Sequence, residues 1–363
     1  PTGYRSLCSK NLATPSPAGV VNPRRHFDSL LYTGNGSDGH KITGLEFKPD
    51  LVWFKMRSST ANHDLYDSVR GGNKRLIPND TSGESTYSNL IQSFNEDGVT
   101  LGTSQEMNKN SETFVAWCWK AGGAAVTNTV GNISAQVSAN DEAGFSIITY
   151  TGDGNTSGNV GTGLRSTQPL AWAIVKRRDS TSDWQVGHHG SGNGVNFAYH
   201  TNLNDYSAVS GNAPYHMGTQ SATNGDRLYL AEGGLTSSAT YVAYVWQERP
   251  GYSKFGSYKG NGNSDGTMIY LGFKPAYFVL KGVHDDSWYV YDNKRDPINP
   301  VDREFNFHNT QTEASSHDID FLSNGVKMRN SNSSWNYNNY TYMYMAFAEQ
   351  PSGTMFGLDA NAR

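Results

Sequence analysis

One short pattern recurs three times in this chain and constrains its fold more than any other feature. An aromatic strand end is followed by a Gly-Asn-Gly or Gly-Asp-Gly turn at residues 32–36, 150–154 and 258–262. The three tyrosines that open the pattern lie 118 and 108 residues apart, and each is followed by a similar order of strands. Because recurrence in a kept order is stronger evidence than a single motif, we interpret the chain as three copies of one module.

Later landmarks repeat in the same order. Each copy has an apolar strand that ends in a lysine, at Lys55, Lys176 and Lys281, and these lysines lie 121 and 105 residues apart. Each copy then closes on a second apolar strand. The predicted segments are an extended connector at 1–26, a first module at 27–122, a linker with short β character at 123–143, a second module at 144–250, a third module at 251–352 and a C-terminal tail at 353–363.

The composition indicates β structure. The chain has 39 Gly residues together with many Asn, Ser and Thr, which favour turns, and no segment shows convincing helical periodicity. Large side chains (8 Trp, 21 Tyr and 15 Phe) supply enough apolar area for compact cores. We therefore expect an all-β fold of three tandem antiparallel β-sandwich modules; the pattern does not separate a plain sandwich from a jelly-roll topology.

The closing strands have two apolar faces. A strand with one solvated face would alternate apolar and polar residues, so these strands are expected to be central and covered on both sides. The cover would be a second sheet on one side and a loop, a neighbouring module or a partner chain on the other. The bulky face comprises Val115, Trp117, Trp119, Val242, Tyr244, Trp246, Met343, Met345 and Phe347, and the opposite face Phe114, Ala116, Cys118, Tyr241, Ala243, Val245, Tyr342, Tyr344 and Ala346.

Charge and cysteine content exclude several classes of partner. Charged residues make up 17% of the chain and the net charge is −4, which argues against nucleic acid. No run approaches the ~18 apolar residues of a membrane span, so we expect no membrane insertion. The two cysteines, Cys8 and Cys118, match no metal spacing, and Cys118 is expected to be a buried thiol. No cofactor is predicted.

Two groups of residues resemble metal sites but have a simpler interpretation. The Gly-Asn/Asp-Gly loops offer oxygen ligands around Asn35, Asp153 and Asn261, yet they lack the downstream bidentate Glu of an EF-hand, and these residues are favoured in turns. His188 and His189 are adjacent, so on a strand they would point to opposite faces, and we interpret them as loop histidines. We expect no metal site, and we expect the strand-end lysines to be solvated or paired.

The most suggestive binding segment is residues 334–340. Here Trp335, Tyr337 and Tyr340 alternate with Asn and Ser, and such rings can stack on sugar faces while the polar groups bond hydroxyls. The alternative is a loop whose aromatic side chains complete the core below Tyr342. No nucleophile elbow or P-loop is present, and we expect no enzymatic activity.

Four motifs carry a resemblance to a known family. They are the Tyr-Thr-Gly-Asn/Asp-Gly turns, Gly-Phe-Lys-Pro at 272–275, Phe-Leu-Ser-Asn-Gly at 321–325 and the Tyr-Val-Ala-Tyr strand followed by Glu at 240–248. Together they resemble a repeat of uncharacterised function in virion proteins of tailed bacteriophages, especially marine and cyanobacterial ones. The resemblance extends over residues 3–351. A lectin-like domain often precedes such repeats, which would fit a chain that starts at Pro1.

The resemblance implies a location in the virion and a structural or host-adhesion role, with no catalytic motif to carry over. We therefore expect a non-enzymatic structural protein of a phage tail, fibre or surface appendage, with the modules as rigid spacers. Expected partners are copies of the same chain in a homo-oligomer, other virion proteins and host-surface glycans. The alternative is a secreted array of carbohydrate-binding modules associated with polysaccharide recognition or degradation.

Overall fold

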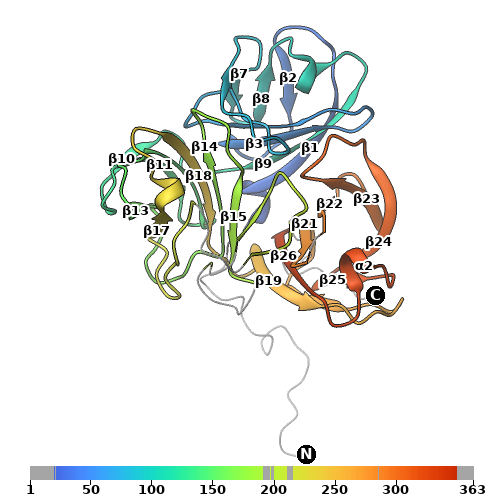
Figure 1. Cartoon of the computed structure of the whole chain (residues 1–363). Coiled ribbons are helices and arrows are strands. Elements are labelled where there is room, and N and C mark those ends of the chain that lie inside the picture. The colour runs from blue at the N-terminus through green and yellow to red at the C-terminus, as the bar shows by residue number, and fades with distance from the viewer. Residues whose placement is uncertain are drawn as a thin grey trace, which may run out of the picture.

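The structure is a computed structural model that describes residues 20, 22–190, 197, 200–210, 216–284 and 286–349. These residues are nearly all β, with 45% in strands and 4% in helices, and every sheet is antiparallel (Figure 1). The expected all-β fold is therefore confirmed. Most of the connector at 1–26 and all of the tail at 353–363 lie outside the described residues.

The first module has a main sheet of order β1-β9-β3-β4 and a smaller sheet of order β2-β8-β7. The two sheets enclose a core of their own, to which both contribute buried residues, for example Phe54 and Leu101. The element bounds are β1 Phe27–Thr33, β2 His40–Thr43, β3 Leu51–Met56, β4 His63–Asp67, β5 Lys74–Arg75, β6 Ser85–Thr86, β7 Ile91–Asn95, β8 Gly98–Leu101, α1 Gln105–Asn108 and β9 Thr113–Trp119.

The second module repeats this plan with a sheet of order β10-β11-β12-β18-β14-β15-β16 and a two-stranded sheet β13-β17. Its element bounds are β10 Val126–Asn128, β11 Ala135–Asn140, β12 Phe145–Thr151, β13 Ser157–Gly161, β14 Trp172–Arg177, β15 Gln185–His188, β16 His200–Asn202, β17 Arg227–Ala231, η3 Glu232–Gly234 and β18 Thr240–Trp246. The short β character expected in segment 123–143 is confirmed by β10 and β11. The segment is not a separate linker, because Ala135 and Val137 are buried in the core of this module.

The third module has one long, curled sheet of order β19-β26-β21-β22-β23-β24-β25-β20. Because the sheet curls, residues of β21 and β26 share a core with residues of β20 and β25. The element bounds are β19 Ser253–Lys259, β20 Met268–Tyr270, β21 Pro275–Gly282, β22 Trp288–Asp292, β23 Val301–Asn306, β24 Ala314–Leu322, β25 Gly325–Met328, α2 Ser333–Asn336 and β26 Thr341–Ala348.

The closing strands β9, β18 and β26 are central strands, as their two apolar faces predicted. Each pairs with a neighbour on both sides, for example β9 with β1 and β3. The face with the smaller residues, which includes Ala116 and Cys118, packs into the core of its own module. The bulky face, which includes Trp117 and Trp119, packs against side chains from the other two modules. The cover on that side is thus the neighbouring modules of the same chain.

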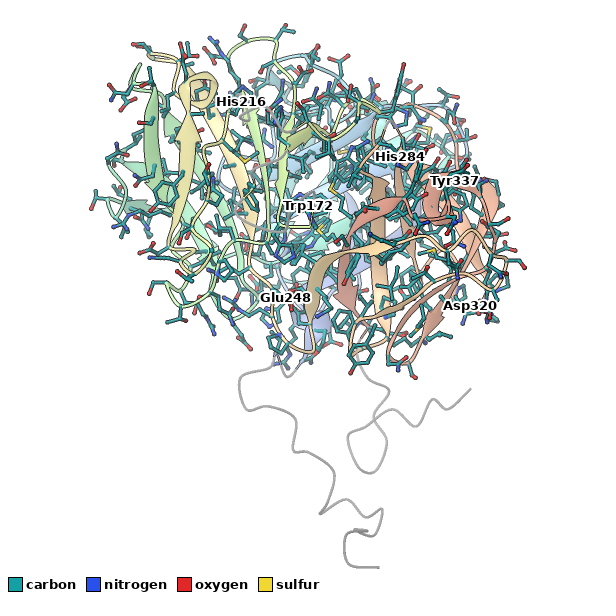
Figure 2. The ribbon with its side chains drawn as sticks, turned by 60° about the horizontal axis from the view of Figure 1, so that its bottom comes forward. Trp172, His216, Glu248, His284, Asp320 and Tyr337 are labelled. Carbon is teal, nitrogen blue, oxygen red and sulfur yellow. The ribbon has the colours of Figure 1, made fainter. Side chains whose placement is uncertain are left out.

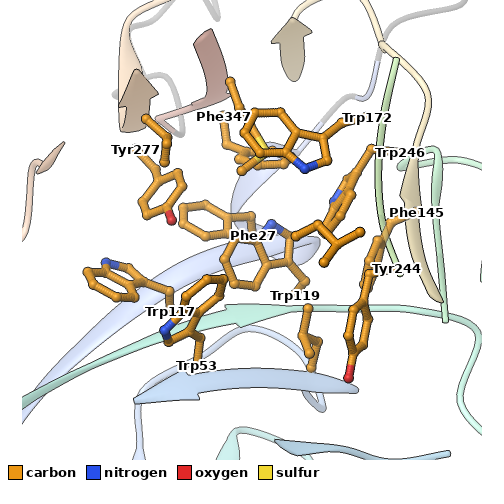
Figure 3. Close-up of a cluster of buried hydrophobic side chains, with 14 of the residues drawn as sticks. Phe27, Trp53, Trp117, Trp119, Phe145, Trp172, Tyr244, Trp246, Tyr277 and Phe347 are labelled. Carbon is orange, nitrogen blue, oxygen red and sulfur yellow. The ribbon is translucent and has the colours of Figure 1, made fainter. Parts of the chain in front are cut away.

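The bulky faces of the three modules meet in one shared core (Figure 3). This shared core comprises Phe27, Trp53, Trp117 and Trp119 of the first module, Phe145, Trp172, Tyr244 and Trp246 of the second, and Tyr277, Met345 and Phe347 of the third, with further residues around them. The modules surround this core and do not follow one another in a row (Figure 1). The aromatic faces that could have bound copies of the chain are therefore buried within one chain.

The strand-end lysines repeat one contact around this arrangement. In each case the ammonium group donates a hydrogen bond to a backbone carbonyl of another module. The pairs are Lys176 with Thr81 at 2.8 Å, Lys281 with Tyr206 at 3.4 Å, and Lys55 with Thr310 at 3.4 Å. The second module thus contacts the first, the third contacts the second, and the first contacts the third, so the three contacts close a ring.

Of the two states expected for these lysines, solvated or paired, the solvated state is wrong. Their exposed fractions are 1% for Lys55 and 0% for Lys176 and Lys281. Burial lowers the pKa of Lys55 and of Lys176 to about 8, because a buried ammonium group loses its hydration. Carbonyl oxygens from the lysine's own loop and from the neighbouring module supply the hydrogen bonds that water would otherwise make.

Candidate functional site

The three Gly-Asn/Asp-Gly loops are turns, and their side-chain oxygens are used to hold the turn. Asn35 Oδ1 accepts a hydrogen bond from the backbone N–H two residues on at 2.8 Å, and Asp153 and Asn261 do the same at 3.0 Å. The last glycine of each loop has a positive φ of 65° to 83°. Among the described residues no group of three or more His, Cys, Asp or Glu side chains could hold a metal ion. The geometry confirms the turn interpretation.

His188 and His189 lie at the contact between the second and third modules. The loop interpretation holds for His189, which is in a turn and half-buried, and is wrong for His188. His188 ends β15 and is 1% exposed. Its Nε2 donates to the carbonyl of Tyr344 at 2.9 Å, while His189 Nε2 donates to the carbonyl of Phe255 at 2.9 Å. Both imidazoles therefore bind backbone carbonyls of the third module, on the paired strands β26 and β19. Their ring centroids lie 5.3 Å apart, so the prediction that the two side chains point to opposite faces is wrong.

Trp335 is a core residue, and its assignment to a glycan-binding surface is wrong. It lies in the one-turn helix α2 and has an exposed fraction of 0%. Its ring packs edge-on against Tyr289 and His317, and its indole N–H donates to Asn330 at 2.8 Å. A ring with no exposed surface cannot stack on a sugar, so this part of the segment completes the core.

Tyr337 and Tyr340 are exposed, with exposed fractions of 48% and 43%. Their ring centroids lie 4.6 Å apart at an interplanar angle of 59°. A third ring, His284 on the loop after β21, lies 4.4 Å from the ring of Tyr340. We call these three residues the tyrosine patch, and Figure 2 shows His284 and Tyr337 near one another on the third module.

A buried carboxylate borders the tyrosine patch. The side chain of Asp286 is 10% exposed, and its Oδ2 lies 3.5 Å from His284 Nε2. The other oxygen, Oδ1, accepts hydrogen bonds from the N–H of Ser287 at 2.7 Å and the hydroxyl of Tyr289 at 3.3 Å. Burial raises the pKa of Asp286 to about 6 because the charged form loses hydration. The patch thus combines three aromatic rings with a carboxylate held in a defined orientation.

Sequence reasoning did not connect His284 or Asp286 with segment 334–340. A usable signal was present, since His284 lies three residues after Lys281, where the other copies have Ser58 and Asp179. Both of those residues accept a hydrogen bond from the first N–H of a closing strand, at Thr113 and Thr240. In the third copy the aromatic ring of His284 stands in place of this hydrogen-bond acceptor, which distinguishes that copy from the other two.

A polar groove between the first and second modules is a weaker candidate. Its lining includes His26, Glu46, Asp50, Lys120 and Glu142. The Asp50 carboxylate accepts hydrogen bonds from the hydroxyl of Ser68 at 2.6 Å and the N–H of Ala121 at 2.8 Å. Its oxygens therefore hold the chain where it leaves the first module, which is a structural task.

The void inside the shared core is too small for a ligand. Its volume is about 10 Å³, close to that of one water-sized sphere, and it is lined by apolar side chains such as Trp172 and Met345. We take the tyrosine patch as the candidate site because its two tyrosine rings are exposed and are grouped with a third ring. None of the helices in those residues has the length and apolar character that a membrane-crossing helix needs.

Comparison with known proteins places the chain in a family without assigning it an activity. The profile of a family described as "Domain of unknown function (DUF7483)" matches residues 22–351. This range begins just before β1 and ends just after β26, so it takes in all three modules together. No curated protein matches the chain.

Proposed function

This chain belongs to the DUF7483 family, and we propose that it is a non-enzymatic structural protein of a tailed-phage virion, in a tail, fibre or surface appendage. The sequence motifs that resemble virion repeats are the starting point for this proposal. The observation that supports it best is the shared core, in which three modules are joined by buried aromatic side chains. A unit built in this way has no loosely attached module and is suited to bearing load.

Buried polar contacts between modules add to this rigidity. The carboxylate of Asp292 in the third module accepts a hydrogen bond from Trp117 Nε1 of the first at 2.9 Å. Asp67 of the first module accepts one from the hydroxyl of Tyr244 of the second at 2.7 Å. Such buried contacts stabilise one relative orientation of the modules, since any other would remove a hydrogen bond from a buried carboxylate and leave a buried donor unpaired.

Contacts with copies of the same chain and with other virion proteins belong to the same proposal. They would use the outer surface, because the bulky strand faces are already buried. Tyr270 on β20 and Ile298 are exposed by 67% and 74% and could take part in such contacts. Attachment to host-surface glycans would use the tyrosine patch of the third module.

The alternative, a secreted array of carbohydrate-binding modules, is favoured by one observation, the exposed rings of Tyr337 and Tyr340. However, the corresponding residues of the first module are Lys109 and Glu112, and those of the second are Thr236 and Ala239. An array would be expected to repeat its binding residues in each module. A single patch on a compact unit fits an appendage protein better.

Particle composition tests the proposal. Virions would be purified from the source of the sequence by two successive density gradients, and their proteins would be quantified by mass spectrometry with antibody labelling in electron micrographs. We expect peptides of this chain at a constant ratio to the major capsid protein across the gradient peak, with label on the tail or surface. Recovery of the chain only in the particle-free fraction would contradict the proposal and favour the secreted alternative.

A further inference from the structure

We infer that Tyr337, Tyr340, His284 and Asp286 form a binding site for one neutral pyranose unit of a surface glycan. The inference rests on the proposed function only for the source of the glycan, because the chemistry of the site is independent of where the protein is found. The site belongs to the third module alone, and its four residues come from the loops that flank β21 and β26.

A comparison of the three copies shows that the rings are an addition to the shared plan. The backbone at Tyr340 has the same role as that at Glu112 and Ala239, because each carbonyl accepts a hydrogen bond from the first glycine of a Gly-x-Gly turn. The turn glycines concerned are Gly260, Gly34 and Gly152. The fold at this place is therefore maintained by backbone atoms and does not require tyrosine. Exposed aromatic side chains that the fold does not need are typical of binding surfaces.

The ring geometry favours a sugar over a cation. Quaternary ammonium groups bind in cages whose rings stand apart around the cation, with the nitrogen about 6 Å or less from each ring centroid. Here the rings of Tyr337 and Tyr340 touch one another, with centroids at 4.6 Å, and His284 touches Tyr340 at 4.4 Å. Rings in contact leave no cage between them. They present a ridge of ring faces and edges on which the apolar C–H face of a pyranose can lie.

The carboxylate of Asp286 supplies the polar half of the site. Its Oδ1 is held by Ser287 and Tyr289, so the direction of Oδ2 is set before a ligand arrives. A carboxylate oxygen accepts hydrogen bonds from sugar hydroxyls, and Oδ2 lies 3.5 Å from His284 Nε2, at the edge of the tyrosine patch. Because Asp286 already carries a negative charge above pH 6, a neutral sugar is favoured over an acidic one.

The test uses the full chain and a fixed set of probes. Methyl glycosides of glucose, galactose, mannose and N-acetylglucosamine would be titrated at pH 7.5, with binding followed by saturation-transfer NMR and calorimetry. Choline chloride and glucuronic acid would be titrated in parallel. The variants are Tyr337→Ala, Tyr340→Ala and Asp286→Asn, and the matched control is Tyr87→Ala, because Tyr87 is exposed by 49% on the first module.

We expect at least one neutral glycoside to saturate the unmodified chain. Tyr337→Ala and Tyr340→Ala should each weaken binding tenfold or more, Asp286→Asn should weaken it with the fold intact, and Tyr87→Ala should leave it unchanged. The inference is overturned if none of the four glycosides binds, if Tyr337→Ala binds as tightly as the unmodified chain, or if only choline or glucuronic acid saturates the site. Failure here would leave the virion role open, since that role is decided by particle composition.

Discussion

The guanidinium group of Arg178 in the second module holds the carboxylate of Glu84 in the first, with two nitrogen–oxygen distances of 2.9 Å. Arg70 of the first module completes the group at 3.0 Å from the same carboxylate. The contact between the third and first modules repeats this arrangement, with Arg57 bound to Glu313 at 2.9 Å.

The third inter-module contact keeps the backbone geometry and replaces the charges. The N–H of Val209 donates to the carbonyl of Val283 at 2.9 Å, as the N–H of Glu84 does to the carbonyl of Arg178 at 2.6 Å. Valine thus stands in both positions where the other two contacts have Arg and Glu. The backbone hydrogen bond is common to all three inter-module contacts. The side chains beside it determine whether the rest of the contact is ionic or apolar.

Removing the Glu84 charge should destabilise the chain strongly. Glu84→Ala leaves Arg70, whose side chain is 0% exposed, without this partner, and breaking a buried pair typically costs about 3–5 kcal/mol. We expect the free energy of unfolding, measured in urea, to fall by an amount near the lower end of that range, because Arg70 keeps Asp67 as a partner. Glu248→Ala is the control, since its contact with Lys254 is partly exposed and 3.5 Å long, and it should change stability by less than about 1 kcal/mol.

The hydroxyl of Tyr244 should contribute measurably to the free energy of unfolding. Tyr244→Phe removes the 2.7 Å hydrogen bond to Asp67 and should cost about 1.5–3 kcal/mol, the usual range for a bond to a charged group. Tyr66→Phe is a matched control, because the buried hydroxyl of Tyr66 has no hydrogen-bond partner in the described structure. Chemical denaturation of both variants would show equal losses if the inter-module bond were unimportant.

Tyr337→Ala and Trp335→Ala should separate the surface of segment 334–340 from its core. Trp335 fills the core of the third module, so its replacement by alanine should cost about 3–5 kcal/mol. Tyr337 is half exposed, and its replacement should change stability by no more than about 0.5–1 kcal/mol. Comparable losses of melting temperature in the two variants would contradict the assignment of Trp335 to the core and Tyr337 to the surface.

His188 should make the chain less stable in acid. Its Nδ1 accepts a hydrogen bond from the N–H of Gly190 at 2.8 Å while Nε2 donates, so both nitrogens require the neutral ring. Burial, with a smaller effect of His189, lowers its pKa well below 6.5. The unfolded chain therefore binds this proton more readily than the folded chain. The contribution of the neutral His188 ring to the stability of the chain is fully present above about pH 6.5 and is lost as the pH falls below that value.

A variant isolates this effect from that of other titrating groups. Burial raises the pKa values of Asp64 and Asp286 to about 7 and about 6, so protonation of these two groups stabilises the folded chain as the pH falls. This effect opposes that of His188. Melting of the unmodified chain and of His188→Gln would be compared at pH 7.5, 6.5 and 5.5. The stability difference between the two should shrink as the pH falls; a constant difference would show that His188 does not titrate on unfolding in this range.

The tyrosine patch shows why sequence reasoning reached only part of the site. Trp335 and Tyr337 are two residues apart in a segment of uniform composition. The local sequence pattern therefore does not tell which of the two side chains is buried. The one-turn helix α2 at Ser333–Asn336 places Trp335 toward Tyr289 and His317 and leaves Tyr337 outside. These partners come from distant parts of the chain, and burial depends on them.

The sequence by itself determined the threefold repeat, the all-β class, the turn loops and the closing strands with two apolar faces. These features follow from local backbone preference and from the alternation of side chains along a strand, which neighbouring residues alone establish. The tertiary structure decided that the bulky faces meet in one shared core, that Lys55 and its two counterparts are buried, and that segment 135–140 joins the second module. Each of these depends on contacts between residues far apart in the chain, whose free energy appears only once the modules have packed together.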